Sequence, residues 1–178
     1  MVRIILTGTH GTGKTTILNH YRDELPVVTE VVRTLTKQGL KINEMGDEEG
    51  QKLIFDTHIK NLSEKHDYIS DRGPTDAMAY TMYHYTEQGK ISATELAREA
   101  TELANFIEKN PDIIWCYFPV EFPVVDDGVR STEEKFRKYV NDEIKSILER
   151  YHVKYHVITG TVEERIKTID KIIELCKS

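Results

Sequence analysis

The segment from Gly8 to Thr15 constrains the fold more than any other part of the chain. It reads G-T-H-G-T-G-K-T and matches the pattern G-x-x-x-x-G-K-[ST]. A loop of this pattern wraps a phosphate with its own backbone N–H groups, and its glycines permit the dihedral angles that the wrap requires. The pattern indicates such a loop where a strand precedes it and a helix follows it.

The flanking sequence supplies that context. Residues 2–7 form a short, apolar, β-branched run that predicts a buried strand, and residues 14–24 carry apolar side chains at helical spacing. The positive end of this helix would point at the anion, with the Lys14 ammonium at the β- and γ-phosphates and the Thr15 hydroxyl on Mg²⁺. We therefore predict that the chain binds ATP, or a similar triphosphate, together with Mg²⁺.

The whole loop and the residue after it are expected to contact the nucleotide. This set comprises Gly8, His10, Gly11, Thr12, Gly13, Lys14, Thr15 and Thr16. His10 stands at a variable position of the pattern, so we expect it to shape the loop rather than to act as a catalytic base.

The rest of the chain alternates between short apolar runs and longer segments of helical periodicity. Further strands are predicted at residues 27–29, 68–70, 113–118 and 153–158. Further helices are predicted at residues 47–66, 74–88, 92–110, 131–151 and from 161 onwards, the last three opening on the capping pairs Ser92 with Glu95, Ser131 with Glu134, and Thr161 with Glu164. Strands that alternate with helices need crossover connections, so we predict an α/β fold with a mostly parallel sheet covered by helices on both faces.

The composition fits one globular domain over residues 1–178. Hydrophobic residues make up 39% of the chain and charged residues 30%, as in soluble globular proteins rather than disordered ones. The apolar runs are too short for a membrane span or a secretory signal, so we expect a cytoplasmic protein without membrane contacts. The two cysteines lack metal-ligand spacing, and the net charge of −6 argues against a surface that coats nucleic acid.

Asp71 and Arg72 follow the predicted strand at residues 68–70. Ligands of open parallel sheets sit at the carboxyl ends of the strands. Asp71 would therefore face the metal, and Arg72 the phosphoryl group in transfer. The alternative is an acidic–basic pair that closes a strand on the surface, and we favour the functional interpretation because the phosphate loop shares this edge.

Glu30 ends the predicted strand at residues 27–29, on the same edge, and Arg33 follows one turn later. A carboxylate there can accept the proton of an acceptor hydroxyl or orient that hydroxyl. It can equally cap the helix that follows, and the sequence leaves both interpretations open. We expect both residues to contact the acceptor.

Residues 120–138 form a charged stretch that we interpret as a lid. Arg130 lies in the loop before the helix at residues 131–151, and Gly128 could act as its hinge. A mobile arginine that closes over ATP stabilises charge on the γ-phosphate, which is the role expected of Arg130. Arg137 is a second candidate for a contact with ATP, whereas Lys135 and Lys138 fit a solvated helix face.

With these residues in view, the chain resembles the P-loop nucleoside and nucleotide kinases, and most closely the ribosylnicotinamide kinase domains of NAD-biosynthesis proteins. The resemblance covers nearly the whole chain: the loop from Gly8 to Thr15, Thr29-Glu30-x-x-Arg33, the helix from Gln51 to His58, the segment from Asp71 to Asp76, Asp127 to Ser131, and Glu164-Arg165. It implies a P-loop NTPase fold of three layers, a five-stranded parallel sheet of order 2-3-1-4-5, and a helical lid. It also implies that a late loop, with Arg165, lies near the adenine of ATP.

The segment from Asp71 to Asp76, followed by Ala79-Tyr80, is also similar to thymidylate kinases. That similarity implies that Asp71 and Arg72 serve the metal and the phosphates. We also expect Asp76 and Tyr80 to contact the acceptor, since the aromatic cluster of Tyr80, Tyr83 and Tyr85 could stack on an acceptor base. The alternative for Tyr80 is packing against the adjacent helix.

The leading hypothesis is a Mg²⁺-dependent kinase, monomeric or homodimeric, that transfers the γ-phosphate of ATP to a small nucleoside, nucleotide or nicotinamide-riboside-like acceptor. Short chains of this type also occur in bacteriophages, some as kinases of modified bases in DNA, so a DNA acceptor is an alternative. A switch that hydrolyses NTP is a further alternative, although the Asn-Lys-x-Asp motif of GTPases is absent. The residues expected to carry catalysis are Lys14, Glu30, Asp71, Arg72 and Arg130.

Overall fold

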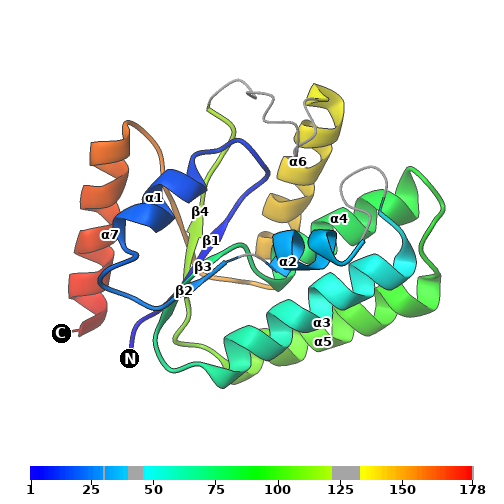
Figure 1. The fold of residues 1–178 in the computed structure, drawn as a ribbon, viewed down its shortest axis with the longest axis horizontal. Helices are drawn as coiled ribbons and strands as arrows, with labels where there is room; N and C mark the ends of the chain where they lie inside the picture. The colour runs from blue at the N-terminus through cyan, green and yellow to red at the C-terminus, as the bar shows by residue number, and fades with distance from the viewer. Residues whose placement is uncertain (30, 40–45, 122–132, 178) are drawn as a thin grey trace.

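A parallel sheet of five strands forms the centre of the molecule (Figure 1). The computed structural model describes residues 1–29, 31–39, 46–121 and 133–177. The strands are β1 (Arg3–Thr7), β2 (Val27–Val28), β3 (Tyr68–Asp71), β4 (Ile114–Tyr117) and β5 (Tyr155–Val157). Their order in the sheet is β2-β3-β1-β4-β5, with each neighbouring pair parallel, which confirms the predicted fold class and strand order.

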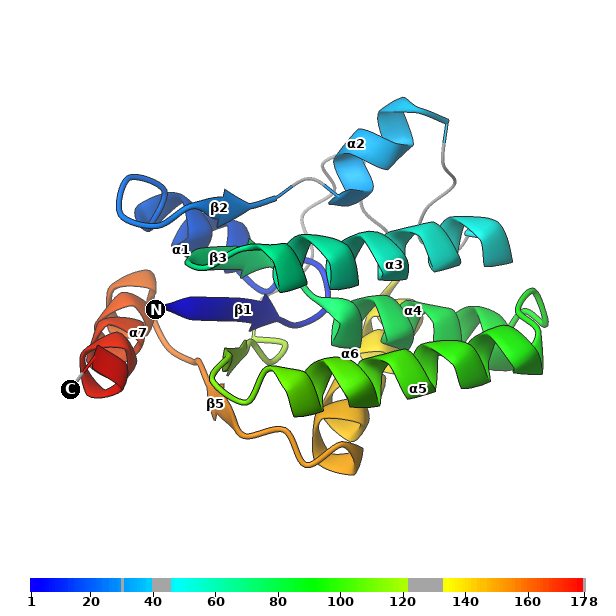
Figure 2. The same ribbon diagram turned by 90° about the horizontal axis from the view of Figure 1, so that it is seen from below.

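The helices pack on both faces of this sheet. They are α1 (Lys14–His20), α2 (Val31–Lys37), α3 (Glu48–Glu64), α4 (Pro74–Thr86), α5 (Ala93–Lys109), α6 (Glu134–Arg150) and α7 (Val162–Lys177). Helices α1 and α7 cover one face, and α3, α4, α5 and α6 cover the other (Figure 2). None of the helices in the described ranges is long and apolar enough to cross a membrane.

Strand β1 shows why these apolar runs form buried strands. All five of its residues are buried, because neighbouring strands flank it and helices cover both of its faces. Ile4 and Leu6 point into the core beneath α1 and α7, whereas Ile5 points into the core beneath the other helices. This alternation is the two-residue period of a strand, applied to a sheet that is buried on both sides.

The capping predictions have three different outcomes. At α7 the box is complete, since Glu164 N–H donates to Thr161 Oγ1 over 3.2 Å and Thr161 N–H donates to Glu164 Oε2 over 2.8 Å. At α6 the helix begins at Glu134 with Glu133 as its N-cap, and the predicted cap Ser131 lies outside the described residues.

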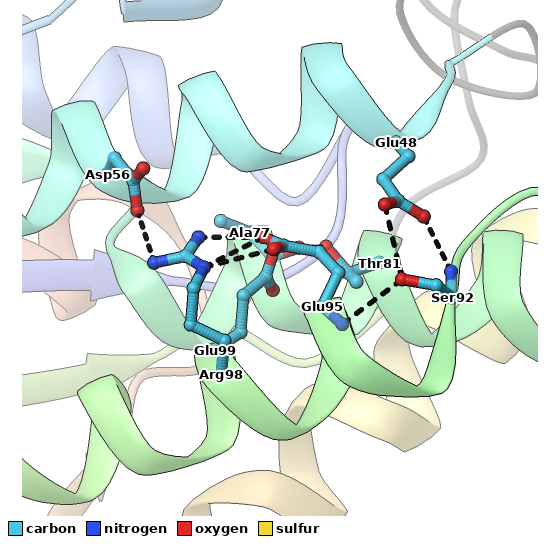
Figure 3. Close-up of polar contacts among 8 residues, drawn as sticks. All are labelled: Glu48, Asp56, Ala77, Thr81, Ser92, Glu95, Arg98 and Glu99. Carbon is cyan, nitrogen blue, oxygen red and sulfur yellow. Dashed lines mark hydrogen bonds and ion pairs between the residues drawn. The ribbon is translucent and has the colours of Figure 1, made fainter.

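At α5 only half of the predicted box forms. Ser92 Oγ accepts a hydrogen bond from Glu95 N–H over 3.1 Å. The N–H of Ser92, however, donates to the carboxylate of Glu48 on α3 rather than to that of Glu95 (Figure 3). Glu95 binds Arg98 instead. A tertiary contact thus replaces the local one, because α3 and α5 lie side by side.

Candidate active site at the carboxyl edge of the sheet

The phosphate loop joins β1 to α1 and has the backbone that its glycines predicted. Gly8 has φ 149° and Gly13 has φ 88°, a conformation that L side chains rarely adopt. A Cβ atom on Gly8 would lie 2.6 Å from the carbonyl oxygen of Phe118, so a side chain there would also collide with the end of β4. The sequence at these positions is therefore set by backbone geometry.

The side chain of Lys14 lies across the loop. Its ammonium donates to the carbonyl oxygen of Thr9 over 2.6 Å and to Thr12 Oγ1 over 3.1 Å, and only 5% of the residue is exposed. This places one positive charge within the hollow that the loop encloses. Lys14 thus occupies the position that contact with an anion in the loop requires.

Two buried arginines hold the carbonyl oxygens of the loop. Arg137 on α6 donates to the carbonyls of His10 and Gly11 over 3.2 and 2.9 Å. Arg165 on α7 donates to the carbonyl of Thr12 over 2.7 Å. Each residue is 1% exposed. Both arginines therefore support the loop from within the protein, and their predicted contacts with ATP stay predictions.

Arg165 also ties the loop to the edge of β4. Its guanidinium forms an ion pair with Glu121, donates to the carbonyl of Gly160 over 2.9 Å and lies 5.4 Å from the centre of the Phe118 ring. Gly160 and Arg165 thus connect the turn before α7 to the phosphate loop.

Asp76 on α4 supports the loop from the opposite side. Its Oδ1 accepts from Gly8 N–H over 2.9 Å, and its Oδ2 accepts from Thr7 Oγ1 over 2.8 Å and Gly73 N–H over 3.1 Å. The residue is 1% exposed. Both carboxylate oxygens already bind the protein, but Asp76 also lines the larger cavity described below, so its contact with the acceptor stays a prediction.

Arg72 has a backbone conformation that is unusual for a side chain of its size. Its φ is 74°, and its N–H still donates to the Leu6 carbonyl over 2.9 Å. Its Nη1 donates to the Tyr80 hydroxyl over 2.8 Å. Burial opposes its charge, but Tyr80 together with Asp71 and Asp76 raises the pKa of Arg72, so the guanidinium stays charged. Strained residues held by several contacts are often found at functional sites, and here the unusual backbone places the Arg72 guanidinium at the carboxyl edge of the sheet.

Asp71, at the end of β3, has a buried oxygen without a hydrogen bond. Within the described residues no donor reaches its Oδ1. Thr15 lines the same hollow, together with the phosphate loop and Arg72. Mg²⁺ is commonly held by one or two carboxylates, a hydroxyl and the phosphates of a nucleotide, so Asp71 and Thr15 fit this ion.

Two cavities meet at this edge. The smaller one lies inside the phosphate loop and is lined by residues 10–16 with Asp71 and Arg72. The larger one has a volume of about 170 Å³ and lies between α1, α2, α3 and α4. Both cavities share His10, Thr15, Asp71 and Arg72. Two ligands could therefore meet at one wall.

Helix α3 contributes two polar side chains to the larger cavity that the candidate list from the sequence did not include. Gln51 and His58 are 2% and 3% exposed, and Gln51 Oε1 and His58 Nδ1 have no partner among the described residues. Burial and the nearby charge of Arg72 lower the pKa of His58 to about 4, so this imidazole is neutral at pH 7. The signal available in the sequence was their spacing, since residues seven apart share a helix face and Ile54 lies between them on it.

The remaining acceptor candidates also lie at the larger cavity. Arg33 on α2 lines its exposed part, as does Arg22 after α1, which was not among the residues predicted from the sequence. Tyr80 forms part of the wall, and its ring packs 5.7 Å from that of Phe136 on α6. Both interpretations of Tyr80 are therefore compatible with its position.

Three predicted features lie outside the described residues. They are Glu30, Arg130 and the hinge at Gly128, and most of the segment interpreted as a lid falls there too. Their roles remain predictions. Thr16 lines the smaller cavity and is exposed, and its contact with the nucleotide stays a prediction.

Comparisons with known proteins agree with this geometry. A family described as "AAA domain" matches residues 3–165. A search of curated protein sequences finds no match.

Several solved structures share the fold. Deoxyadenosine kinase from M. mycoides with bound dCTP has a TM-score of 0.67 and 16% identity, over 97% of this chain and 99% of that one. The NadR protein in complex with NR has a TM-score of 0.70 and 15% identity, over 99% of this chain but only 52% of the longer NadR chain. Shikimate kinase from Acinetobacter baumannii in complex with shikimate has a TM-score of 0.59 and 16% identity, over 98% of this chain and 92% of that one.

Proposed function

This chain belongs to the AAA domain family, and from that premise we propose that it is a Mg²⁺-dependent phosphotransferase that moves the γ-phosphate of ATP to a small acceptor. The observation that carries the proposal is the pair of cavities with a common wall. The phosphate loop forms a donor cavity, and a larger cavity opens beside it across Thr15, Asp71 and Arg72. A hydrolytic switch would have no need for a second cavity at this position.

The structural neighbours support a kinase of this kind without naming the acceptor. They are titled deoxyadenosine kinase, NadR with NR and shikimate kinase, and their ligands differ widely in chemistry. At 14–16% identity the likeness concerns the fold. The acceptor must therefore be argued from the side chains of the larger cavity.

On the donor side, four side chains would act on the triphosphate and its metal ion. Lys14 binds the β- and γ-phosphates, and Arg72 neutralises charge on the γ-phosphate as the transfer proceeds. Asp71 and Thr15 would hold Mg²⁺, which would neutralise charge at the phosphate oxygens. Positioning and electrostatics account for most catalysis in phosphoryl transfer, so the protein needs no nucleophile of its own.

On the acceptor side, the cavity suits a ring with a polar edge. Tyr80 and several aliphatic side chains form its apolar walls, while Gln51 and His58 present buried groups without partners. A nucleobase offers hydrogen-bond donors and acceptors along one edge, and buried polar groups gain most from such a partner. We therefore favour a nucleoside or nucleotide acceptor. Glu30 would accept or orient the proton of an acceptor hydroxyl, and Arg130 would close over ATP.

The test is phosphate transfer from γ-labelled ATP with Mg²⁺ to a panel of acceptors. The panel contains nucleosides, nucleoside monophosphates, nicotinamide riboside, shikimate, and DNA with natural and hydroxymethylated bases. We expect label on a small acceptor. Label on DNA alone would move the protein to nucleic-acid modification, and free phosphate alone, unaffected by every acceptor, would contradict the kinase proposal.

A further inference from the structure

The larger cavity concentrates positive charge in a protein whose net charge is −6. Three arginines line it: Arg22 from the turn after α1, Arg33 from α2 and Arg72 from the end of β3. Arg72 stands at the wall shared with the phosphate loop, whereas Arg22 and Arg33 are exposed and line only the larger cavity. The basic groups therefore reach from the donor cavity to the solvent side of the acceptor cavity.

The same three arginines differ from the other arginines of the described ranges in their pairing. Each of the others forms an ion pair with a carboxylate: Arg3, Arg98, Arg137, Arg150 and Arg165. Arg22 donates to Asn19 Oδ1 over 3.2 Å, Arg72 donates to Tyr80, and neither forms an ion pair with a described carboxylate. Arg33 has neither a hydrogen bond nor an ion pair with any residue in the described ranges.

The acidic side chains among the described cavity residues do not offset this charge. They are Asp71 and Asp76. Both oxygens of Asp76 bind Thr7 and the backbone N–H groups of Gly8 and Gly73, and Asp71 is the carboxylate that fits Mg²⁺. The outer part of the cavity therefore presents two guanidinium groups that form no ion pair with a described carboxylate.

We propose that the acceptor carries an oxyanion, either a phosphate monoester or a carboxylate, and that Arg22 and Arg33 bind it. This inference rests on the proposed kinase function. Guanidinium groups bind such oxyanions through paired N–H donors, and an arginine without a protein carboxylate loses no existing ion pair when it does so. A cationic acceptor such as nicotinamide riboside is disfavoured by the same charges.

The transfer itself balances for this acceptor. An acceptor oxygen forms a bond to the γ-phosphorus, the bond from that phosphorus to the oxygen bridging the β-phosphate breaks, and ADP leaves. Where the receiving oxygen belongs to a phosphate dianion, no proton has to be removed. Where it belongs to a hydroxyl, the proton passes to a carboxylate or to water.

The experiment compares matched acceptors and matched variants. Transfer from γ-labelled ATP is measured for nucleosides, for the corresponding 5′-monophosphates, and for shikimate as a carboxylate acceptor. The variants are the double substitution Arg22→Gln with Arg33→Gln, and Arg150→Gln as a control on the exposed side of α6. We expect wild type to prefer an anionic acceptor, and the double variant to raise its KM by roughly 10- to 100-fold with a smaller change in kcat. Arg150→Gln should match wild type.

Two results would overturn the proposal. The first is that wild type has a KM for a neutral nucleoside as low as its KM for the corresponding monophosphate. The second is that the double variant has a KM for the anionic acceptor within twofold of the wild-type value. Binding of the monophosphates and shikimate to the wild type and the double variant, measured by calorimetry without ATP, gives a reading independent of catalysis. If wild type transfers phosphate to nothing, the kinase function fails, and the calorimetry still decides whether the arginines bind an oxyanion.

Discussion

At the scale of single residues, the site consists of side chains whose positions are set by the backbone. Arg72 keeps a φ of 74° because two hydrogen bonds hold its backbone. Its N–H donates to the carbonyl oxygen of Leu6, and its own carbonyl accepts from Ser70 Oγ over 2.7 Å. Lys14 is directed across the phosphate loop by the carbonyl of Thr9. Pre-positioned charges of this kind are what electrostatic catalysis requires, since they need no rearrangement during transfer.

Replacing Lys14 with Ala should reduce phosphate transfer by at least about 100-fold, because one full charge at the β- and γ-phosphates is lost. The fold should survive, as circular dichroism and thermal unfolding would show. Lys60→Ala, at an exposed position of α3, is the matched control and should behave as wild type. Transfer at the wild-type rate by the Lys14 variant would contradict the assigned donor site.

Arg137 should act on ATP through the phosphate loop. Arg137→Gln removes the charged donor that binds the His10 and Gly11 carbonyls. Because a buried charged hydrogen bond is lost, we expect the free energy of unfolding to fall by about 1–3 kcal/mol. We expect KM for ATP to rise several-fold with KM for the acceptor nearly constant, and Arg137→Lys to recover part of the loss. An equal rise of both KM values would indicate general destabilisation instead.

At the scale of elements, α3, α4 and α5 pack around a cluster of charged side chains (Figure 3). Arg98 on α5 forms ion pairs with Asp56 on α3 and Glu95 on its own helix. Glu99, fully buried, accepts from Thr81 Oγ1 on α4 over 3.2 Å. Burial, together with the charges of Glu95 and Asp56, raises the pKa of Glu99 to about 8, although Thr81 and Arg98 act against the shift.

Glu99 should therefore make the stability of these packed helices depend on pH. In the unfolded chain its pKa returns to about 4.5, so between pH 4.5 and 8 unfolding releases a proton that the folded protein keeps. The free energy of unfolding then falls as pH rises through this range. Glu99→Gln removes the charge from both the folded and the unfolded state. We therefore expect its free energy of unfolding to exceed that of wild type by a few kcal/mol at pH 8, and this difference to disappear below pH 4.5.

Urea unfolding at pH 4, 6 and 8 measures this difference. Glu102→Gln, exposed on the same helix, serves as the control for the change of charge. A gap between Glu99→Gln and wild type that stays constant from pH 4 to pH 8 would contradict the buried, protonated carboxyl.

At the scale of the whole molecule, two apolar layers enclose the sheet and leave its carboxyl edge for ligands. The core beneath α1 and α7 fixes one side of the phosphate loop, and the core beneath α3 to α6 fixes the walls of the acceptor cavity. Ligands that bind only the folded molecule stabilise it by mass action.

ATP with Mg²⁺ should accordingly stabilise the whole fold. At a free ATP concentration 100-fold above Kd, we expect the free energy of unfolding to rise by about 2.7 kcal/mol in urea titrations. Chelation of Mg²⁺ should remove part of this gain, and Asp71→Asn should be insensitive to chelation. A gain for wild type that is equal with and without Mg²⁺ would contradict the role of Asp71.

Much of this architecture could be predicted from local patterns. The phosphate loop, the buried strands and the Thr161 cap depend on contacts between residues close in the chain, so their signatures are local and readable. The strand order followed from the resemblance to P-loop kinases, because alternation alone leaves several topologies. Helix α2 received no bounds, since its seven residues are too few for a clear period.

The sequence by itself determined that a phosphate loop joins a buried strand to a helix, and that Asp71 and Arg72 end a neighbouring strand at the same edge. Only the tertiary structure showed which polar and charged side chains line a cavity and which bind the phosphate loop. Arg137, Arg165 and Asp76 matched the pattern of ligand contacts, yet their groups bind the phosphate loop itself. Gln51 and His58 bounded a helix that carried the resemblance to kinases, but only the structure places their side chains at a cavity. The physical reason is that charge and hydrogen-bonding capacity are local properties, whereas burial and partners come from segments up to 153 residues apart in the chain.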